Sequence, residues 1–278
     1  MKTTFASLTF LCISLFFTSL MLTNISNAQL KMDAAVAIWL FDEGEGEIVT
    51  DASGNGNDGV FASGQPKWVD GKFGTALDFN EDWVEGREKE EPDDWVETND
   101  PVVVDTADFT IGCWLKPRTP QHWHANVLSS QEETKGITLA QYENGINRFR
   151  IIIGNIYNWN KLGHPDHVFK LLKEQWAHVA FVREGSQGTW YQNGEVILQE
   201  KLGSADRVPA ATKNFRIGNC VHDDNRVYNG TIDEAFIFEV AMRGREIVSI
   251  AEKGIVGAQS VSPLDKMATI WGSVKNEY

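Results

Sequence analysis

Alternation of apolar and polar side chains over short segments is the feature of this sequence that most constrains its fold. In the segment 109–115, every second residue from Phe109 to Leu115 is apolar, and Thr110, Gly112 and Trp114 occupy the positions between them. A period of two is typical of a β-strand with one buried face. The sequence therefore predicts strands rather than helices for this part of the chain.

A turn signal joins two further expected strands. Residues 189–192 and 195–198 flank Asn193-Gly194, the dipeptide most typical of a two-residue β-hairpin. Similar segments predict strands at 36–41, 76–79, 148–153, 177–182, 215–218 and 231–238. Only 243–253 has a helical period, because Ile247, Ile250 and Ala251 fall on one face. One short C-terminal helix among many strands predicts an all-β fold, a two-sheet antiparallel jelly-roll sandwich.

The first 28 residues have the layout of a secretory signal peptide. Lys2 precedes an apolar stretch centred on 10–17, and the small-residue run Ser26-Asn27-Ala28 follows. We expect cleavage after Ala28 and a protein that is secreted, periplasmic or held at the cell surface; an uncleaved anchor is the alternative. The remaining chain divides into a domain at 29–255 and a C-terminal tail at 256–278, without a membrane span.

Charge and cysteine content exclude two classes of protein. The chain has 25 Lys and Arg against 39 Asp and Glu, a formal net charge of −14. Broad nucleic-acid binding needs clustered basic side chains, so we expect no nucleic-acid partner. Three cysteines are too few for a disulfide-dense scaffold. Cys113 and Cys220, which lie outside the signal peptide, form either a disulfide or two buried free thiols.

Several segments, taken in order, resemble the laminin G-like jelly-roll domains of the concanavalin A-like lectin/glucanase superfamily. The resemblance extends from about residue 35 to residue 253 and implies the concanavalin A-like fold. It does not imply one function, because this fold carries many unrelated activities. The segments that carry it are AIWLFD (37–42), DASGNGNDG (51–59), GKFGTALDF (71–79), DWVE (94–97), FTIGCWLKP (109–117), QWAHVA (175–180), YQNG (191–194), GTIDE (230–234) and RGREIVSI (243–250).

The 51–59 loop predicts a structural calcium site. It offers the side-chain oxygens of Asp51, Asn55 and Asn57, and its glycines allow the backbone to curl around an ion. The resemblance adds Asp233, because members of this family often hold calcium where such a loop meets the closing strand. The alternative is a Gly/Asn turn that its own side chains cap. Calcium in this place would stabilise the native state and would not catalyse.

Candidate catalytic groups are incomplete. Glu91, Asp93 and Glu97 could share one face of a strand, but Pro92 interrupts the run. The pairs His122/His124 and His164/His167 each offer only two zinc ligands, fewer than a zinc site usually needs. The sequence therefore favours a non-catalytic domain, with a glycoside hydrolase or lyase of the same superfamily as the alternative.

Aromatic side chains beside polar ones in loops predict a ligand site. Aromatic rings cover the apolar faces of sugars, and neighbouring polar groups bond the hydroxyls. Tryptophans within strand patterns are expected in the core, whereas loop positions favour function. We therefore expect a secreted domain that recognises a glycan or an extracellular protein, or, alternatively, an adhesion or structural component. The predicted ligand-binding residues are Trp123, Tyr157, Trp159, Asp224, Asn225 and Tyr228.

Overall fold

The structure, a computed structural model, describes residues 30–81, 83, 93–130, 132, 134–141, 145–154, 169–222 and 225–259. The predicted signal peptide at 1–28 and the tail beyond residue 259 lie outside the described residues. The segment Leu30–Ala258 forms one compact unit.

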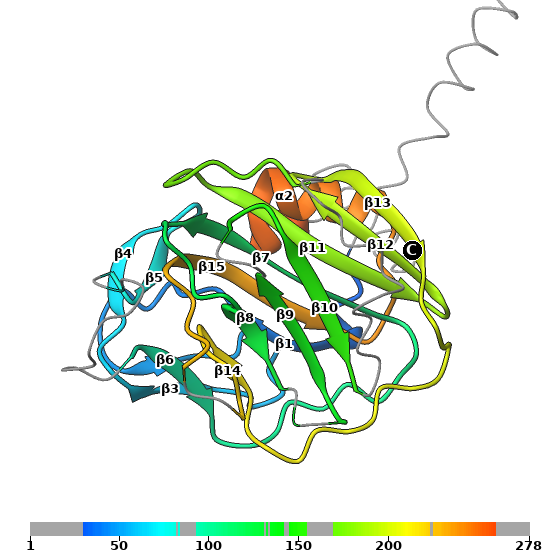
Figure 1. Ribbon diagram of the computed structural model, residues 1–278, viewed down its shortest axis with the longest axis horizontal. Coiled ribbons are helices and arrows are strands. Elements are labelled where there is room, and N and C mark those ends of the chain that lie inside the picture. Colours follow the sequence, from blue (N-terminus) through cyan, green and yellow to red (C-terminus); the bar gives the residue numbers. More distant parts are fainter. Residues whose placement is uncertain are drawn as a thin grey trace, which may run out of the picture. The chain divides into compact units, whose positions relative to one another are not determined.

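Two antiparallel sheets make up the unit (Figure 1). The described strands of the first sheet, sheet A, run in the order β13-β12-β11-β7-β15-β5-β4, and β1 pairs with one end of β15. Their bounds are β1 Ala35–Trp39, β4 Lys67–Asp70, β5 Thr75–Phe79, β7 Phe109–Pro117, β11 Ala177–Glu184, β12 Gln187–Gln192, β13 Glu195–Lys201 and β15 Gly230–Phe238.

The second sheet, sheet B, runs in the order β10-β9-β8-β14-β6-β3-β2 within the described residues. The alternating pattern did not predict β2, β3, β8 or β9. Its strands are β2 Ile48–Val49, β3 Gly59–Ser63, β6 Trp95–Thr98, β8 Asn126–Ser129, β9 Ile137–Gln141, β10 Phe149–Ile153 and β14 Arg216–Ile217.

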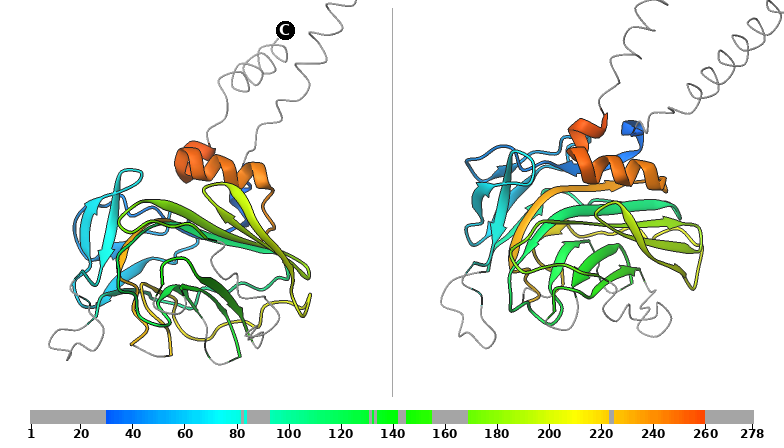
Figure 2. Two further views of the ribbon diagram at one scale, coloured as in Figure 1. Left: turned by 45° about the horizontal axis from the view of Figure 1, so that its top comes forward. Right: turned by 90° about the horizontal axis from the view of Figure 1, so that it is seen from above.

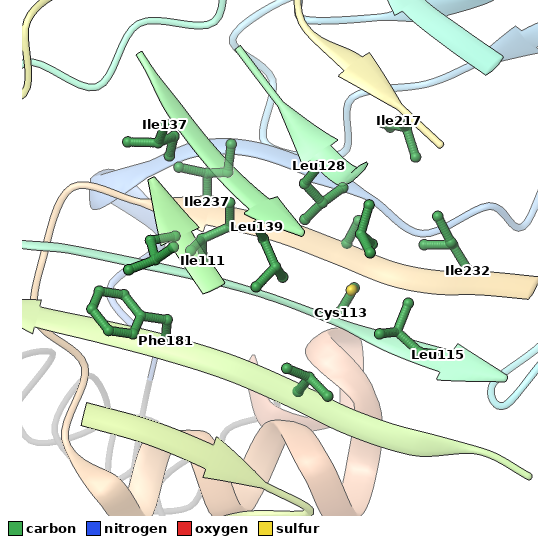
Figure 3. Packing of buried hydrophobic residues seen from close by; sticks show 14 of the residues in the cluster. Ile111, Cys113, Leu115, Leu128, Ile137, Leu139, Phe181, Ile217, Ile232 and Ile237 are labelled. Atoms are coloured by element: carbon green, nitrogen blue, oxygen red, sulfur yellow. The ribbon is translucent and has the colours of Figure 1, made fainter. Parts of the chain in front are cut away.

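The main core lies between the two sheets. The apolar face predicted for 109–115 is confirmed, since Ile111, Cys113 and Leu115 of β7 all belong to this core and are fully buried. Figure 3 shows these side chains together with Leu128 of β8 and Leu139 of β9, from the other sheet. The two-sheet sandwich that the alternating pattern predicted is therefore confirmed.

A helix covers the outer face of sheet A. A short 3-10 helix, η1 Met32–Ala34, precedes β1, and helix α2 spans Gly244–Gln259 with a non-helical backbone at Gly254. Ile247 and Ile250 of α2 pack in a second core with Phe236 and Phe238 of β15. Figure 2 shows α2 on the side of sheet A that faces away from sheet B. The helix continues past the predicted end at residue 253, so residues 256–259 belong to α2 rather than to the tail.

Three of the four tryptophans expected in the core are buried in strands, namely Trp39, Trp114 and Trp190, whereas Trp176 is half-buried just before β11. Trp123, in a loop, is 55% exposed. Cys113 and Cys220 are both buried free thiols, the second of the two alternatives. No helix within the described residues is long and apolar enough to cross a bilayer.

Candidate functional site

Two loops that are far apart in the sequence are joined side by side. Residues 118–125 connect β7 to β8, and residues 218–229 connect β14 to β15. The backbone N–H of Arg118 donates to the carbonyl of Asn229 over 3.1 Å, and that of Asn126 donates to the carbonyl of Arg226 over 2.9 Å. Two of the three loops predicted to bind a ligand therefore adjoin each other.

Buried amides fix this junction. The side chains of Gln121 and Asn229 are 1% and 2% exposed. The N–H of Asn229 donates to Gln121 Oε1 over 3.0 Å, and Asn229 Nδ2 donates to the carbonyl of Pro120 over 3.0 Å. Gln121 Nε2 donates in return to the carbonyls of Arg118 and Asn229. Because these hydrogen bonds join the two loops inside the protein, they hold the loop that carries Trp123 in place.

Aromatic and basic side chains gather on the outer side of that base. The rings of Trp123 and His124 meet edge to face with centroids 4.7 Å apart, and His122 lies 6.1 Å from Trp83 in the same way. His124 Nδ1 lies 2.7 Å from Arg150 Nη2, which ties the loop to β10 of sheet B. We call Trp83, His122, Trp123, His124 and Arg150 the Trp123 surface. An exposed indole with hydrogen-bonding groups beside it suits a ligand that has both apolar and hydroxylated faces.

The other predicted ligand-binding residues have different outcomes. Asn225 is exposed in the second loop, next to Arg226. Tyr157, Trp159 and Asp224 lie outside the described residues. Tyr228 is fully buried in the core between the sheets, so its predicted place on the ligand surface is corrected. Sequence reasoning missed this because Tyr228 stands in a polar loop segment and its burial depends on the tertiary packing.

The formal glycosylation sequence at Asn229-Gly-Thr231 is enclosed by the fold. Asn229 is held against Pro120 as described above, and Thr231 Oγ1 donates to the buried Asp78 Oδ1 over 2.7 Å. A glycan on Asn229 would displace the contacts that fix the loop junction. The folded domain therefore uses this segment as structure.

The 51–57 loop turns its polar groups inward. Asp51 Oδ1 accepts hydrogen bonds from the N–H of Ile38 and the N–H of Ser53, both at 2.9 Å. Asp51 Oδ2 accepts from Ser53 Oγ at 2.8 Å and from the N–H of Asn57 at 3.0 Å. Both oxygens of the carboxylate are thus occupied by the protein itself, as in the self-capped turn that was the alternative to calcium.

The two asparagines of this loop also bond the backbone. Asn55 Nδ2 donates to the carbonyl of Ala35 at 2.7 Å, and Asn57 Nδ2 donates to the carbonyl of Val36 at 2.8 Å. These carbonyls belong to β1, which pairs only with β15 in sheet A among the described strands. The loop therefore supplies β1 with hydrogen bonds that a neighbouring strand would otherwise give.

Asp233, the fourth predicted calcium ligand, reaches a different loop. Its Oδ2 accepts from the N–H of Lys72 at 2.7 Å and of Phe73 at 3.0 Å. Its Oδ1 is buried and has no hydrogen-bond partner among the described residues. Burial, followed by the charge of Glu234, raises the pKa of Asp233 to about 7. Burial and then the charge of Asp42 raise the pKa of Glu234 to about 7 as well.

The described residues contain no group of three or more His, Cys, Asp or Glu side chains placed to hold a metal ion. Three of the four predicted ligands lie in the 51–57 loop, whereas Asp233 of β15 accepts hydrogen bonds from the 71–75 loop. The three loop residues fit a hydrogen-bonded turn. Of the four, Asp233 keeps a buried oxygen, Oδ1, without a hydrogen-bond partner among the described residues.

In the described part of the predicted acidic run, residues 93–97, the candidate carboxylates are paired or buried. Glu97 of β6 pairs with Arg216 of β14, with Oε2 and Nε 2.6 Å apart, and the same guanidinium lies 4.7 Å from the ring of Trp95. Asp93 is 6% exposed. Glu91 lies outside the described residues. Glu97 and Asp93 therefore do not present two accessible carboxylates on one strand face.

Comparison with known proteins agrees with this architecture. A laminin G-type family model, described as the concanavalin A-like lectin/glucanases superfamily, matches residues 89–248. No curated protein matches the sequence significantly. One similar solved structure is domain 4 of AbnA, a GH43 extracellular arabinanase from Geobacillus stearothermophilus, in complex with arabinotriose. It has a TM-score of 0.59 at 19% identity and covers 78% of this chain and 98% of that one.

Two toxin domains are similar over part of their length. The binding domain of Paraclostridial Mosquitocidal Protein 1 has a TM-score of 0.54 at 13% identity. The match covers 79% of this chain and 52% of that one. The ligand-binding domain of botulinum neurotoxin serotype D, in complex with N-acetylneuraminic acid, has a TM-score of 0.52 at 14% identity, with 80% of this chain covering 51% of it. The chain thus spans about half of each toxin domain, and at these identities the likeness shows the fold. With the family model matching more than half of its length, the chain belongs to the concanavalin A-like lectin/glucanases superfamily.

Proposed function

We propose that this domain is a non-catalytic module that binds a glycan through the Trp123 surface. The observation that carries the proposal is the exposed indole of Trp123 on a loop that buried Gln121 and Asn229 hold in place. A ring fixed before binding loses little conformational freedom when a sugar stacks on it. The imidazoles of His122 and His124 lie beside it as hydrogen-bonding groups.

The fold neighbours support a carbohydrate as the ligand class. The AbnA domain was solved with arabinotriose and the serotype D toxin domain with N-acetylneuraminic acid. These ligands are those of the neighbours, and they serve here as the first probes. An extracellular protein as the partner is the outcome to distinguish from a glycan. Export of the chain, expected from residues 1–28, is part of this proposal.

Titration calorimetry with arabino-oligosaccharides and N-acetylneuraminic acid tests the proposal. Replacing Trp123 by Ala removes the stacking surface, so the affinity for a bound sugar should fall about tenfold or more, ~1.4 kcal/mol. Trp123→Phe keeps a ring and should retain part of the affinity. Val256→Ala is the matched control, because Val256 is 59% exposed on α2, away from the loops. Equal affinities in wild type, Trp123→Ala and Val256→Ala would contradict the proposed site.

Hydrolysis is not part of the proposal. A retaining glycosidase needs two carboxylates about 5–5.5 Å apart on either side of the sugar bond. In the described part of the acidic run, Glu97 is paired with Arg216 and Asp93 is buried. Incubation with a bound polysaccharide should therefore release no reducing ends. Steady release that Glu97→Gln abolishes would show an enzyme instead.

We also propose a structural calcium ion at Asp233 rather than in the 51–57 loop. Asp233 Oδ1 lacks a partner among the described residues, whereas Oε2 of the neighbouring Glu234 accepts a hydrogen bond from the N–H of Ile255. Calcium accepts backbone carbonyls and water as further ligands, so it does not need three acidic side chains. An ion here should raise the melting temperature, and Asp233→Asn should remove that shift while Asp51→Asn keeps it. No shift between calcium and EDTA in the wild-type protein would contradict this proposal.

A further inference from the structure

A cavity on the β12–β13 hairpin lies apart from the Trp123 surface. It has a volume of about 440 Å³ and is lined by Lys170, Gln192, Asn193, Glu195 and Ile197. The hairpin is the one that Asn193-Gly194 predicted, and it forms the edge of sheet A (Figure 1). None of these five residues was a predicted site residue, because the cavity forms only when the segment before β11 packs beside the hairpin.

The wall opposite the hairpin is firmly attached. Phe169 and Leu171 are 1% and 2% exposed and anchor the segment in the core. Between them, the N–H of Lys170 donates to Gln192 Oε1 over 2.8 Å, and the N–H of Leu171 donates to Asn147 Oδ1 over 2.6 Å. Alternation therefore turns the Lys170 side chain outward, to the cavity. The cavity exists before a ligand arrives.

The lining has the chemistry of a small sugar site. Ile197 offers a half-buried apolar surface, and Gln192 and Asn193 offer amide nitrogens, since their side-chain oxygens accept from the N–H groups of Lys170 and His178. Lys170 contributes an ammonium group from one wall and Glu195 a carboxylate from the other. Neither makes an ion pair with another described residue, so both remain available to a ligand. A donor, an acceptor and two amides around one apolar side chain match the hydroxyls and the C–H face of a sugar ring.

The strand register places this cavity at the same end of sheet A as the Trp123 loop. Leu115 of β7 lies opposite Ala177 of β11, Val179 opposite Gln192 of β12, and Gln192 opposite Glu195 of β13. The loop that carries Trp123 leaves β7 just beyond Pro117. Three strand spacings separate the ends of β7 and β13. The Trp123 loop and the cavity therefore lie at one end of sheet A, and a ligand that contacts both must extend across that end.

We propose that the cavity is a second sugar subsite and that a glycan chain contacts it and the Trp123 surface together. The class of ligand rests on the proposed function, whereas the position rests on the cavity. Two linked contacts on one ligand raise the affinity more than either contact does alone, provided that the ligand can span both. A longer oligosaccharide should therefore bind much more tightly than a short one.

A chain-length series tests this proposal. Calorimetry with arabinose, arabinotriose and arabinohexaose on the wild-type domain should show a rise in affinity of about tenfold or more between the shortest binding member and the hexaose. The double variant Lys170→Gln/Glu195→Gln should lose that rise and keep the affinity for the short sugar. Its charge-matched control is Glu184→Gln/Lys201→Gln, which changes exposed residues of sheet A outside the cavity lining.

The outcomes separate the two proposals. If the hexaose binds and the cavity variant binds it as tightly as the control does, the second subsite is wrong and the Trp123 site stands. If the cavity variant loses binding and Trp123→Ala does not, the glycan site is the cavity alone. If no member of the series and no N-acetylneuraminic acid binds at millimolar concentration, both proposals fail for these sugars.

Discussion

The 51–57 loop and the loop pair around Trp123 are both rich in polar residues, but they use them in opposite directions. In the first, Asp51, Asn55 and Asn57 turn inward and bond the backbone of β1 and of the loop itself. In the second, Gln121 and Asn229 bond inward while Trp123 remains exposed. A loop can bind a ligand only with groups that its own fold does not use. The first loop is therefore occupied by structural hydrogen bonds, and the second is the one that we propose for recognition.

Removing Asp51 should have the largest effect on stability. Its carboxylate accepts four hydrogen bonds, and the residue is 5% exposed, so Asp51→Ala leaves several buried donors without partners. We expect the free energy of unfolding to fall by about 3 kcal/mol or more in urea denaturation. Asp70→Ala, on an exposed residue of β4, is the control and should change little. If Asp51→Ala lowered the free energy of unfolding no more than Asp70→Ala does, the contrast between the two loops would be wrong.

Removing the inward bonds of the second loop should cost less stability. Gln121→Ala deletes the amide that joins the 118–125 loop to Asn229, for an expected loss of about 1–3 kcal/mol. The affinity for a glycan should fall as well, because the loop that carries Trp123 is no longer held by these hydrogen bonds. Urea denaturation and calorimetry on the same sample would measure both. Unchanged binding in Gln121→Ala would mean that the junction does not position Trp123.

The pH dependence of stability should distinguish Asp233 from the 51–57 loop. The pKa of Asp233 is raised from its ordinary value of 3.8 to about 7, since burial and the charge of Glu234 disfavour the carboxylate. The folded protein therefore holds this proton where the unfolded chain has released it. The contribution of Asp233 to the free energy of unfolding is fully present below about pH 4 and is lost as the pH rises to about 7.

Thermal melts in EDTA between pH 4 and pH 8 would measure that contribution. Asp233→Asn cannot lose a proton, so its melting temperature should fall less across this range than that of the wild-type protein. The two curves should diverge toward pH 8, with the variant the more stable there. Parallel curves would show that Asp233 ionises in the folded domain as it does in the unfolded chain.

The smallest effect on stability is expected at Trp123 itself. A side chain that is 55% exposed has little packing to lose, so Trp123→Ala should change the free energy of unfolding by less than about 0.5 kcal/mol. The same variant should lose glycan affinity. A large loss of stability would instead give Trp123 the structural role that Asp51 has.

The sequence predicted more of the fold than of the site. Alternation in 109–115 and the Asn193-Gly194 turn depend on local geometry, and β7 and the β12–β13 hairpin formed as expected. Which polar groups stay free depends instead on contacts between distant segments. Tyr228 looked like a loop residue and is buried in the core, and Asp51 looked like a metal ligand and bonds Ile38. The cavity of the β12–β13 hairpin was missed for the same reason, since Lys170 reaches it only through tertiary packing.

A glycan array probed in parallel with the wild-type domain and Trp123→Ala tests whether Trp123 carries the recognition of a glycan. We expect the wild-type protein to bind one group of related glycans and Trp123→Ala, with the same melting temperature, to lose those signals. Identical signals from both proteins would contradict it. The proposal would also be contradicted if neither protein bound a glycan and both bound the same extracellular protein.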